Sequence, residues 1–180
     1  VALDIQKLVN ELNDITGQGV PAPNLIISER AQILMPYHVL QDGYEEERLG
    51  GRAFGSTKSG IAPFYSDKYA KIGIQVADLF DEDRLRSRLN AAVEMKNIIF
   101  EHLYHKPPVD AEALFQQLLE YREQIRPYVG DAVSFVHQAL KEGKTVLLEG
   151  QLGSMKDPDL GICPMTTSSH TLAGADKVYK

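Results

Sequence analysis

The most informative part of the sequence reads Phe54-Gly55-Ser56-Thr57-Lys58-Ser59-Gly60-Ile61-Ala62-Pro63-Phe64-Tyr65-Ser66-Asp67-Lys68. Glycines and small hydroxyl side chains fill its first half, and a helix-like pattern follows. Backbone N–H groups approach an anion closely only where side chains are small, and the N-terminus of a following helix adds a favourable dipole. The stretch indicates a phosphate-binding loop, although its composition alone equally fits a flexible, solvated turn. It is not a Walker A loop, because Ser56 and Thr57 stand where that motif needs Gly-Lys.

The residues before this loop alternate between helical and extended patterns. Apolar side chains recur at the spacing of one helix face, at Leu3, Leu8, Val9, Leu12 and Ile15, and Gly17 predicts the end of that helix. Short apolar runs at 24–28 and 32–35 predict buried strands, the second ended by Pro36. The charged run 42–48 favours a solvated helical face over a recognition surface.

The residues after the loop are mainly helical. Residues 81–104 read as a long amphipathic helix that begins at three acidic residues and ends before Pro107-Pro108. Helices are also predicted over 110–125 and 130–140, so 81–142 form a helical subregion. The β-branched and apolar run Thr145–Leu148 predicts a buried parallel strand that opens into a glycine loop. The pattern therefore predicts an α/β fold, part of a mainly parallel central sheet with a large helical insertion.

Composition narrows the class of protein. The chain has 180 residues, of which 43% are hydrophobic, enough to build one core. A formal net charge of -6 argues against a nucleic-acid or anionic-membrane surface and favours a small-molecule partner. The single cysteine, Cys163, excludes an internal disulfide. No apolar run approaches the roughly 20 residues of a membrane span, and no signal peptide is evident, so we expect a cytoplasmic protein.

A second informative run lies between Val146 and Gly174. It holds Glu149-Gly150-Gln151-Leu152-Gly153, Asp157-Pro158-Asp159, Pro164-Met165-Thr166-Thr167-Ser168-Ser169-His170 and Ala173-Gly174. The first run continues to Val76-Ala77-Asp78-Leu79, and Ile27-Ser28-Glu29-Arg30-Ala31 leads to Met35-Pro36-Tyr37-His38. In this order, and over nearly the whole chain, these motifs resemble adenylosuccinate synthetase.

The resemblance implies a ligase of purine biosynthesis. In that family GTP phosphorylates the 6-oxygen of IMP, and L-aspartate displaces the phosphate to give adenylosuccinate with Mg²⁺ assisting; the enzyme is a homodimer. The family places its glycine loop, catalytic aspartate and catalytic histidine upstream of these motifs, and its guanine and aspartate loops downstream. We therefore expect residues 1–180 to be the central segment of such a domain. The segment should bind IMP, contain no catalytic or metal-binding residue, and be inactive alone.

The resemblance also assigns IMP-binding residues. Thr57 and Thr167 match nucleotide-contacting threonines, and Ser56 keeps a hydroxyl where the family has threonine. Lys71 stands where the family has an arginine that reaches the nucleotide phosphate of the neighbouring subunit, and lysine keeps the charge but loses the bidentate fork. Leu152 falls on a nucleotide-contacting glutamine, for which Gln151 is a possible substitute.

Some departures leave alternatives open. Ser59 replaces a family arginine and His170 a family asparagine, so the nucleotide substrate is in question. One alternative is a related ligase that joins aspartate to a guanine nucleotide, as some phage members of the family do. Another is a non-catalytic paralogue or fragment that serves dimerisation. His102 and His105 lack the partners of a metal site, and Asp159, Ser168, Ser169 and His170 lack the Gly-x-Ser-x-Gly elbow of a hydrolase.

Overall fold

The computed structural model describes residues 2–150 and 152–172, and it is an α/β structure. The helices are α1 (Ile5–Gly17), α2 (Pro36–Leu49), α3 (Ile61–Tyr69), α4 (Glu82–Ile99), α5 (Ala111–Ile125) and α6 (Ala132–Lys141). The strands are β1 (Ala2–Leu3), β2 (Ile27–Ser28), β3 (Gln32–Ile33) and β4 (Val129–Gly130). Short 3₁₀ turns lie at Gly50–Arg52, Val76–Phe80, Arg126–Tyr128 and Ser154–Lys156, and a π-helical turn at Phe100–Tyr104 extends α4.

Aspartate residues begin most of these helices. Asp4, Asp81, Asp110 and Asp131 precede α1, α4, α5 and α6, and each carboxylate accepts hydrogen bonds from free N–H groups of the first turn at 2.8–3.2 Å. Such a cap typically contributes about 1 kcal/mol to helix stability. The predicted helices over 81–104, 110–125 and 130–140 are confirmed, because local caps and apolar spacing agree on the same boundaries.

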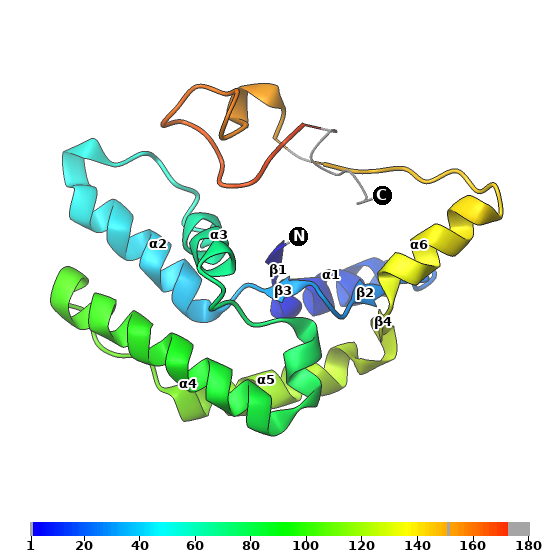
Figure 1. The fold of residues 1–180 in the computed structure, drawn as a ribbon, viewed down its shortest axis with the longest axis horizontal. Coiled ribbons are helices and arrows are strands. Elements are labelled where there is room, and N and C mark those ends of the chain that lie inside the picture. The colour runs from blue at the N-terminus through cyan, green and yellow to red at the C-terminus, as the bar shows by residue number, and fades with distance from the viewer. Residues whose placement is uncertain (1, 151, 173–180) are drawn as a thin grey trace.

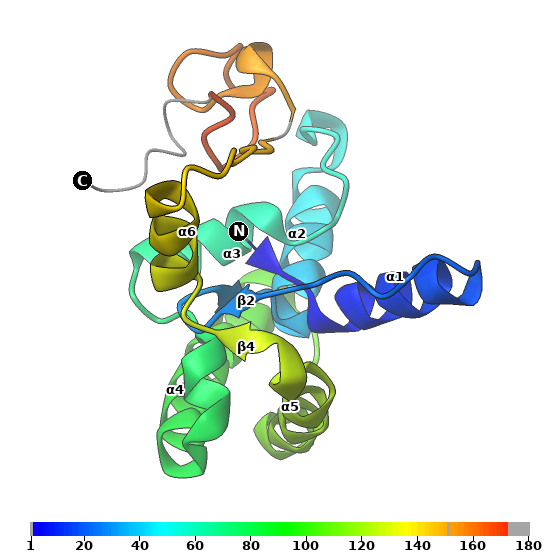
Figure 2. The same ribbon diagram turned by 90° about the vertical axis from the view of Figure 1, so that its right-hand side faces the viewer.

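The strands form two separate parallel pairs. β1 pairs with β3, in the register Ala2↔Gln32, and β2 pairs with β4, in the register Ile27↔Val129. Figure 2 shows β2 and β4 side by side between α6 and α5. The predicted strands at 24–28 and 32–35 exist, but each is only two residues long.

The predicted strand Thr145–Leu148 is wrong for the described structure. These residues have no regular structure, and Leu147 and Leu148 are 89% and 54% exposed. A buried parallel strand needs a hydrogen-bonded neighbour and a covering layer. None of the described strands pairs with this segment, so the side chains of Leu147 and Leu148 stay in solvent.

The core lies where α4 and α5 pack together with α1 and α2. Phe100, Leu85, Leu89 and Leu118 are at most 2% exposed, and burial of each such side chain stabilises the fold by roughly 1.5–3 kcal/mol. α2 packs along α3 and contacts the π-helical turn, whereas α5 contacts both α1 and α4 (Figure 1).

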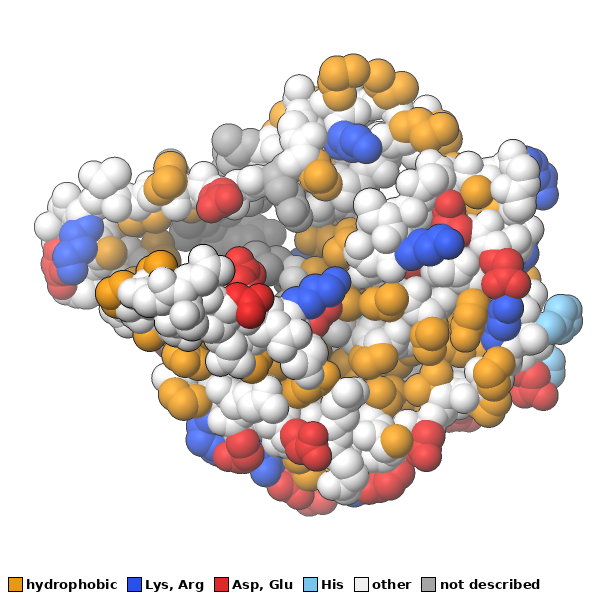
Figure 3. Space-filling view, turned by 180° about the vertical axis from the view of Figure 1, so that it is seen from behind, with side chains coloured by type: hydrophobic (Ala, Val, Ile, Leu, Met, Phe, Trp, Pro, Cys, Tyr) orange, Lys and Arg blue, Asp and Glu red, His pale blue; other side chains and the backbone are white. Residues whose placement is uncertain are grey.

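The outer edge of α4 and α5 is charged. Charged side chains, most of them acidic, line the lower edge in Figure 3. Arg122 of α5 pairs with Glu82 of α4 at 2.9 Å. Within the described residues, no helix is both long and apolar enough to cross a lipid bilayer.

Candidate functional site

The loop 54–60 lies against one face of α2. Glu46 accepts hydrogen bonds from the backbone N–H groups of Phe54 (3.1 Å) and Gly55 (3.0 Å) through its two carboxylate oxygens. One helical turn earlier, Asp42 accepts from the Ser56 hydroxyl (2.7 Å) and from the Gly60 N–H (2.8 Å). Two carboxylates therefore hold the beginning and the end of the loop.

These contacts correct the prediction that 42–48 form a solvated face. Asp42 is only 8% exposed. The isolated charge run gave no sign of this role, because the binding partners lie 14 to 18 residues further along the chain. The only usable sequence signal was the four-residue spacing of His38, Asp42 and Glu46, which places them on one helix face.

The hydroxyl groups of the loop fall into two sets. Ser56 donates its only hydroxyl proton to Asp42 and accepts from the Lys58 N–H at 3.0 Å, so its side chain serves the loop itself. Thr57 is exposed, and its hydroxyl lies 2.8 Å from that of Ser59. In the described structure, the N–H groups of Ser56, Thr57 and Ser59 donate no hydrogen bond. These amides thus have no acceptor among the described residues, and the Thr57 hydroxyl pairs there only with that of Ser59.

Gly60 ends the loop and starts α3. Its φ of +79° is in the left-handed region, and a Cβ there would lie 2.7 Å from the Val39 nitrogen and 2.8 Å from the His38 carbonyl carbon. Only glycine allows both the conformation and the close approach to the α2 backbone. The loop therefore meets the helix at a fixed point.

A buried polar network also fixes α3 against α2 and α4. His38 accepts from the Met35 N–H at Nδ1 (3.0 Å), so its Nε2–H donates to Asp67 (2.9 Å). Lys96 of α4 donates to Asp67 (2.6 Å) and to Gln41 (2.8 Å). Burial lowers the pKa of His38, and its bond to Asp67 opposes this only in part. Burial would raise the pKa of Asp67, but hydrogen bonds from His38 and Lys96 outweigh it and lower that pKa.

The second motif folds around Asp157. Its carboxylate, 1% exposed, accepts from the N–H groups of Asp159 (3.0 Å), Leu160 (3.2 Å) and Thr171 (3.0 Å). Those backbone bonds, with Thr171 first, lower the pKa of Asp157. Thr167 donates its N–H to the Lys156 carbonyl at 2.9 Å and is half-buried. The turn therefore presents Thr167 on a shaped loop rather than on a helix or strand.

His170 lies between two acidic side chains. Its Nδ1 is 3.4 Å from Asp157 and its Nε2 is 3.7 Å from Asp159. The three side chains have the types and proximity of metal ligands. Backbone N–H groups already occupy both oxygens of Asp157, however, so the hydrogen bonds of its own loop account for this carboxylate. His102 and His105 do not form a metal-binding group among the described residues.

One contact joins the two motifs. Burial raises the pKa of Tyr65 in α3, and a side-chain hydrogen bond with Ser169 opposes that rise. Ser169, and with it the segment 164–171, therefore approaches α3, the helix that follows the loop. Figure 1 shows this segment, in orange and red, folded on the side of α3 away from α4.

Lys71 lies at the far end of α3. It is exposed, has a φ of +65°, and follows the last helical turn. The Ile72 N–H donates to the Asp67 carbonyl (3.0 Å) and the Lys71 N–H to the Lys68 carbonyl (3.2 Å), the two bonds of a Schellman motif. A nine-residue helix is roughly 13 Å long, so Lys71 and Thr57 are not brought together within one chain.

The remaining predicted residues are less informative. Leu152 is 55% exposed with a φ of +74°. Gln151, its possible substitute, lies outside the described residues, as do Ala173 and Gly174. Among the described residues, the Ser59 side chain forms a hydrogen bond only with Thr57.

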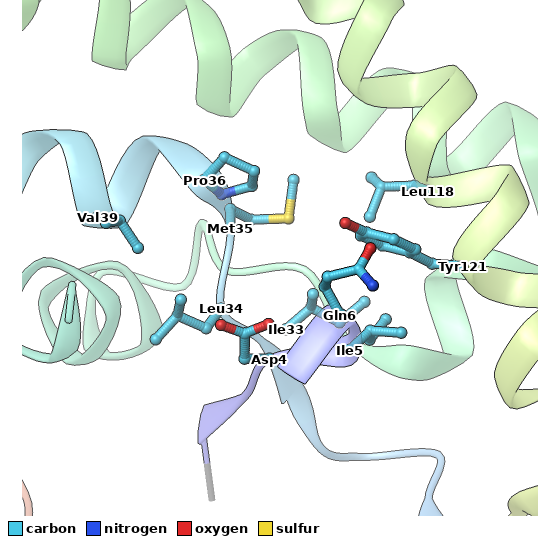
Figure 4. Close-up of a pocket in the computed structure, with 10 residues that line it drawn as sticks. All are labelled: Asp4, Ile5, Gln6, Ile33, Leu34, Met35, Pro36, Val39, Leu118 and Tyr121. Atoms are coloured by element: carbon cyan, nitrogen blue, oxygen red, sulfur yellow. The ribbon is translucent and has the colours of Figure 1, made fainter. Parts of the chain in front are cut away.

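A pocket of about 200 Å³ lies beside α1. Its walls come from the start of α1, the β3–α2 junction and α5, including Ile5, Met35 and Leu118 (Figure 4). Asp4 faces it, but that carboxylate already caps α1. None of the residues 54–60 or 164–171 lines this pocket, so it is separate from the loop site.

The fold and the site define an α/β protein that presents a hydroxyl-rich loop at the start of a helix. The sequence profile of adenylosuccinate synthetase matches residues 1–178. The chain belongs to the adenylosuccinate synthetase family.

Individual relatives agree with this assignment. The adenylosuccinate synthetase of Heliobacterium modesticaldum is 42% identical over 178 residues, which are 99% of this chain and 42% of that protein. That of Caldicellulosiruptor saccharolyticus is 39% identical over 174 residues, 97% of this chain and 41% of that protein. A solved structure of fully ligated adenylosuccinate synthetase from Plasmodium falciparum is similar with a TM-score of 0.82 at 28% identity, covering 97% of this chain and 40% of that one. The chain thus spans about two fifths of the length of these relatives.

Proposed function

We propose that this chain is the IMP-binding part of an adenylosuccinate synthetase, the ligase that joins L-aspartate to IMP at the expense of GTP with Mg²⁺. One observation carries the proposal: just before α3, Thr57 is exposed and the described N–H groups of Ser56, Thr57 and Ser59 donate no hydrogen bond, while Tyr65 of α3 approaches Ser169 of the motif that holds Thr167. An exposed hydroxyl and several amides at a helix N-terminus suit a nucleotide monophosphate. The match of residues 1–178 to the family, and the identity to its members over nearly the whole chain, support the same interpretation.

Each group has a distinct role in this proposal. Thr57 and the loop amides donate to the phosphate of IMP, Thr167 donates from the second motif, and Lys71 supplies a cation to the nucleotide of a partner subunit. Mg²⁺ would neutralise charge on the transferring phosphoryl group. Asp157, His170 and Asp159 do not fit that ion, because they already hold the second motif together.

The test uses the full-length parent protein with IMP, GTP, Mg²⁺ and aspartate, and follows the absorbance of adenylosuccinate. Thr57→Ala should weaken IMP binding by roughly 1–2 kcal/mol, the worth of one hydrogen bond to a charged group. Lys58→Ala is the matched control from the neighbouring position and should have little effect. Equal losses for both variants in calorimetry would contradict the assignment. Turnover with a guanine nucleotide but not with IMP would favour the alternative ligase, which the apolar Leu152 leaves open.

A further inference from the structure

Three polar side chains of α2 face the loop and α3 at a four-residue spacing. We call His38, Asp42 and Glu46 the α2 stripe, because residues four apart lie on one face of a helix. Along α2, the stripe holds first α3, then the end of the loop, and then its beginning. The loop therefore has its conformation set from one side by a single rigid element.

Glu46 takes the first backbone donors of the loop. Phe54 and Gly55 each donate an N–H group to it, one to each carboxylate oxygen. Those two amides are therefore unavailable to a bound phosphate. Gly55, with a φ of +75°, makes the turn that brings both N–H groups to the same carboxylate.

Asp42 also binds a hydroxyl that would otherwise compete with Thr57 as a donor to the phosphate. It binds the hydroxyl proton of Ser56, which leaves that side chain without a donor for phosphate. Because Asp42 also binds the N–H of Gly60, the segment between these two contacts is restrained at both ends. Thr57 lies in that segment, and its hydroxyl and amide are directed by neither carboxylate.

We propose that Asp42 and Glu46 are positioning residues that pre-form the phosphate loop and leave Thr57 and its flanking amides as the phosphate donors. This inference rests on the proposed function. A loop ordered before binding does not lose its conformational freedom when the nucleotide arrives. Two carboxylates beside an anion site are tolerated because each accepts two hydrogen bonds from the loop, which offsets their charge. Ser56 is then an anchor of the loop rather than a second phosphate ligand.

The experiment compares IMP with inosine, which lacks the phosphate, in calorimetric or competition binding to the full-length protein. Glu46→Gln and Asp42→Asn keep side-chain size but turn one acceptor into a donor. Each should weaken IMP binding about tenfold or more and change inosine binding less than about twofold. Glu47→Gln is the matched control, because Glu47 is the next residue of α2, is exposed, and pairs with half-buried Lys106 rather than with the loop. Ser56→Thr, which keeps the hydroxyl, should preserve IMP binding.

The outcomes distinguish the positioning role of Asp42 and Glu46 from the proposed function. If Glu46→Gln and Asp42→Asn leave the ratio of IMP to inosine affinity unchanged, or reduce both affinities alike, the positioning role is wrong. If buried Asp42→Asn does not fold, half-exposed Glu46→Gln decides by itself. If the unmodified protein does not distinguish IMP from inosine, the proposed function fails first, and this inference with it.

Discussion

Gly60 is the residue at which the loop, α3 and α2 meet. Replacing it with alanine places a methyl group within 2.8 Å of two backbone atoms of α2 and forces a side chain into the left-handed region. Backbone atoms of a helix cannot give way as a flexible side chain does. We expect Gly60→Ala to lower the free energy of unfolding by about 3 kcal/mol or more, measured in urea.

Gly55→Ala is the matched control for that measurement. Gly55 has nearly the same φ, +75°, but an added methyl group would meet no atom beyond its chain neighbours within 4 Å. Its substitution should cost only the backbone term, about 1–2 kcal/mol. Similar losses at both positions would show that conformation, and not contact with α2, explains the glycine at 60.

His38 should make stability depend on pH. Its pKa lies below the ordinary 6.5, because burial disfavours the charged ring. The unfolded chain then binds a proton more tightly, so stability is complete above pH 6.5 and falls as the pH drops below it. Asp67, with a lowered pKa, adds a further loss at more acidic pH, below its ordinary value of 3.8.

The measurement is the urea midpoint from pH 7.5 to 5. His38→Asn keeps an acceptor for the Met35 amide but does not titrate, so its stability should vary less over this range. His102→Gln, at an exposed position, is the control and should retain the dependence of the unmodified protein. A steeper dependence in His38→Asn than in that control would contradict the assignment.

Individual site residues were only partly predictable from sequence. The loop was located because glycine and hydroxyl residues cluster there. The different roles of Ser56 and Thr57 could not be predicted, because they depend on Asp42, which lies 14 residues away from Ser56. The same limit applies to Asp157. Its hydrogen-bond partners are backbone N–H groups of its own loop, and the residue types in the sequence do not reveal such partners.

At the scale of elements, α3 ends in an unusual way. Lys71 occupies the left-handed position after the helix, where glycine is preferred. Lys71→Gly should therefore raise the free energy of unfolding by about 1 kcal/mol, as measured by urea unfolding. Lys68→Gly, inside α3, is the control and should lower it by a similar amount. A loss of stability in both variants would argue against strain at Lys71.

Helices were predicted better than strands, for a physical reason. A helix closes its hydrogen bonds within one segment, and the caps Asp81 and Asp110 stand next to the apolar pattern they start. A strand depends on a partner elsewhere in the chain. Thr145–Leu148 has the composition of a buried strand and no partner among the described strands. The composition therefore predicts a strand, but no described strand pairs with this segment.

For the whole molecule, we expect IMP and dimerisation to strengthen each other. If Lys71 reaches the nucleotide of a partner subunit, IMP tightens the dimer by the same factor by which dimerisation tightens IMP. Sedimentation of the full-length protein with and without IMP measures this coupling. Lys71→Ala should dimerise without responding to IMP, and a variant that responds as the unmodified protein does would contradict the role across the interface.

The family was evident at this scale because its motifs occur in order along the chain, and residues 1–178 match its profile. The arrangement of the helices was not evident. The contact between Tyr65 and Ser169 and the network of His38, Asp67 and Lys96 join segments that no local pattern connects.

The spacing of the α2 stripe also limits how this family can change length during evolution. Inserting one residue between His38 and Glu46 would rotate everything after it by about 100° around the helix axis, and Glu46 would leave the loop. Gly50–Arg52 are exposed, and added atoms at Gly50 or Gly51 meet nothing within 4 Å. Insertions and deletions among relatives should therefore occur at 50–53 and be missing from 38–46. An insertion library of the full-length protein, scored for growth, should show the same difference in tolerance.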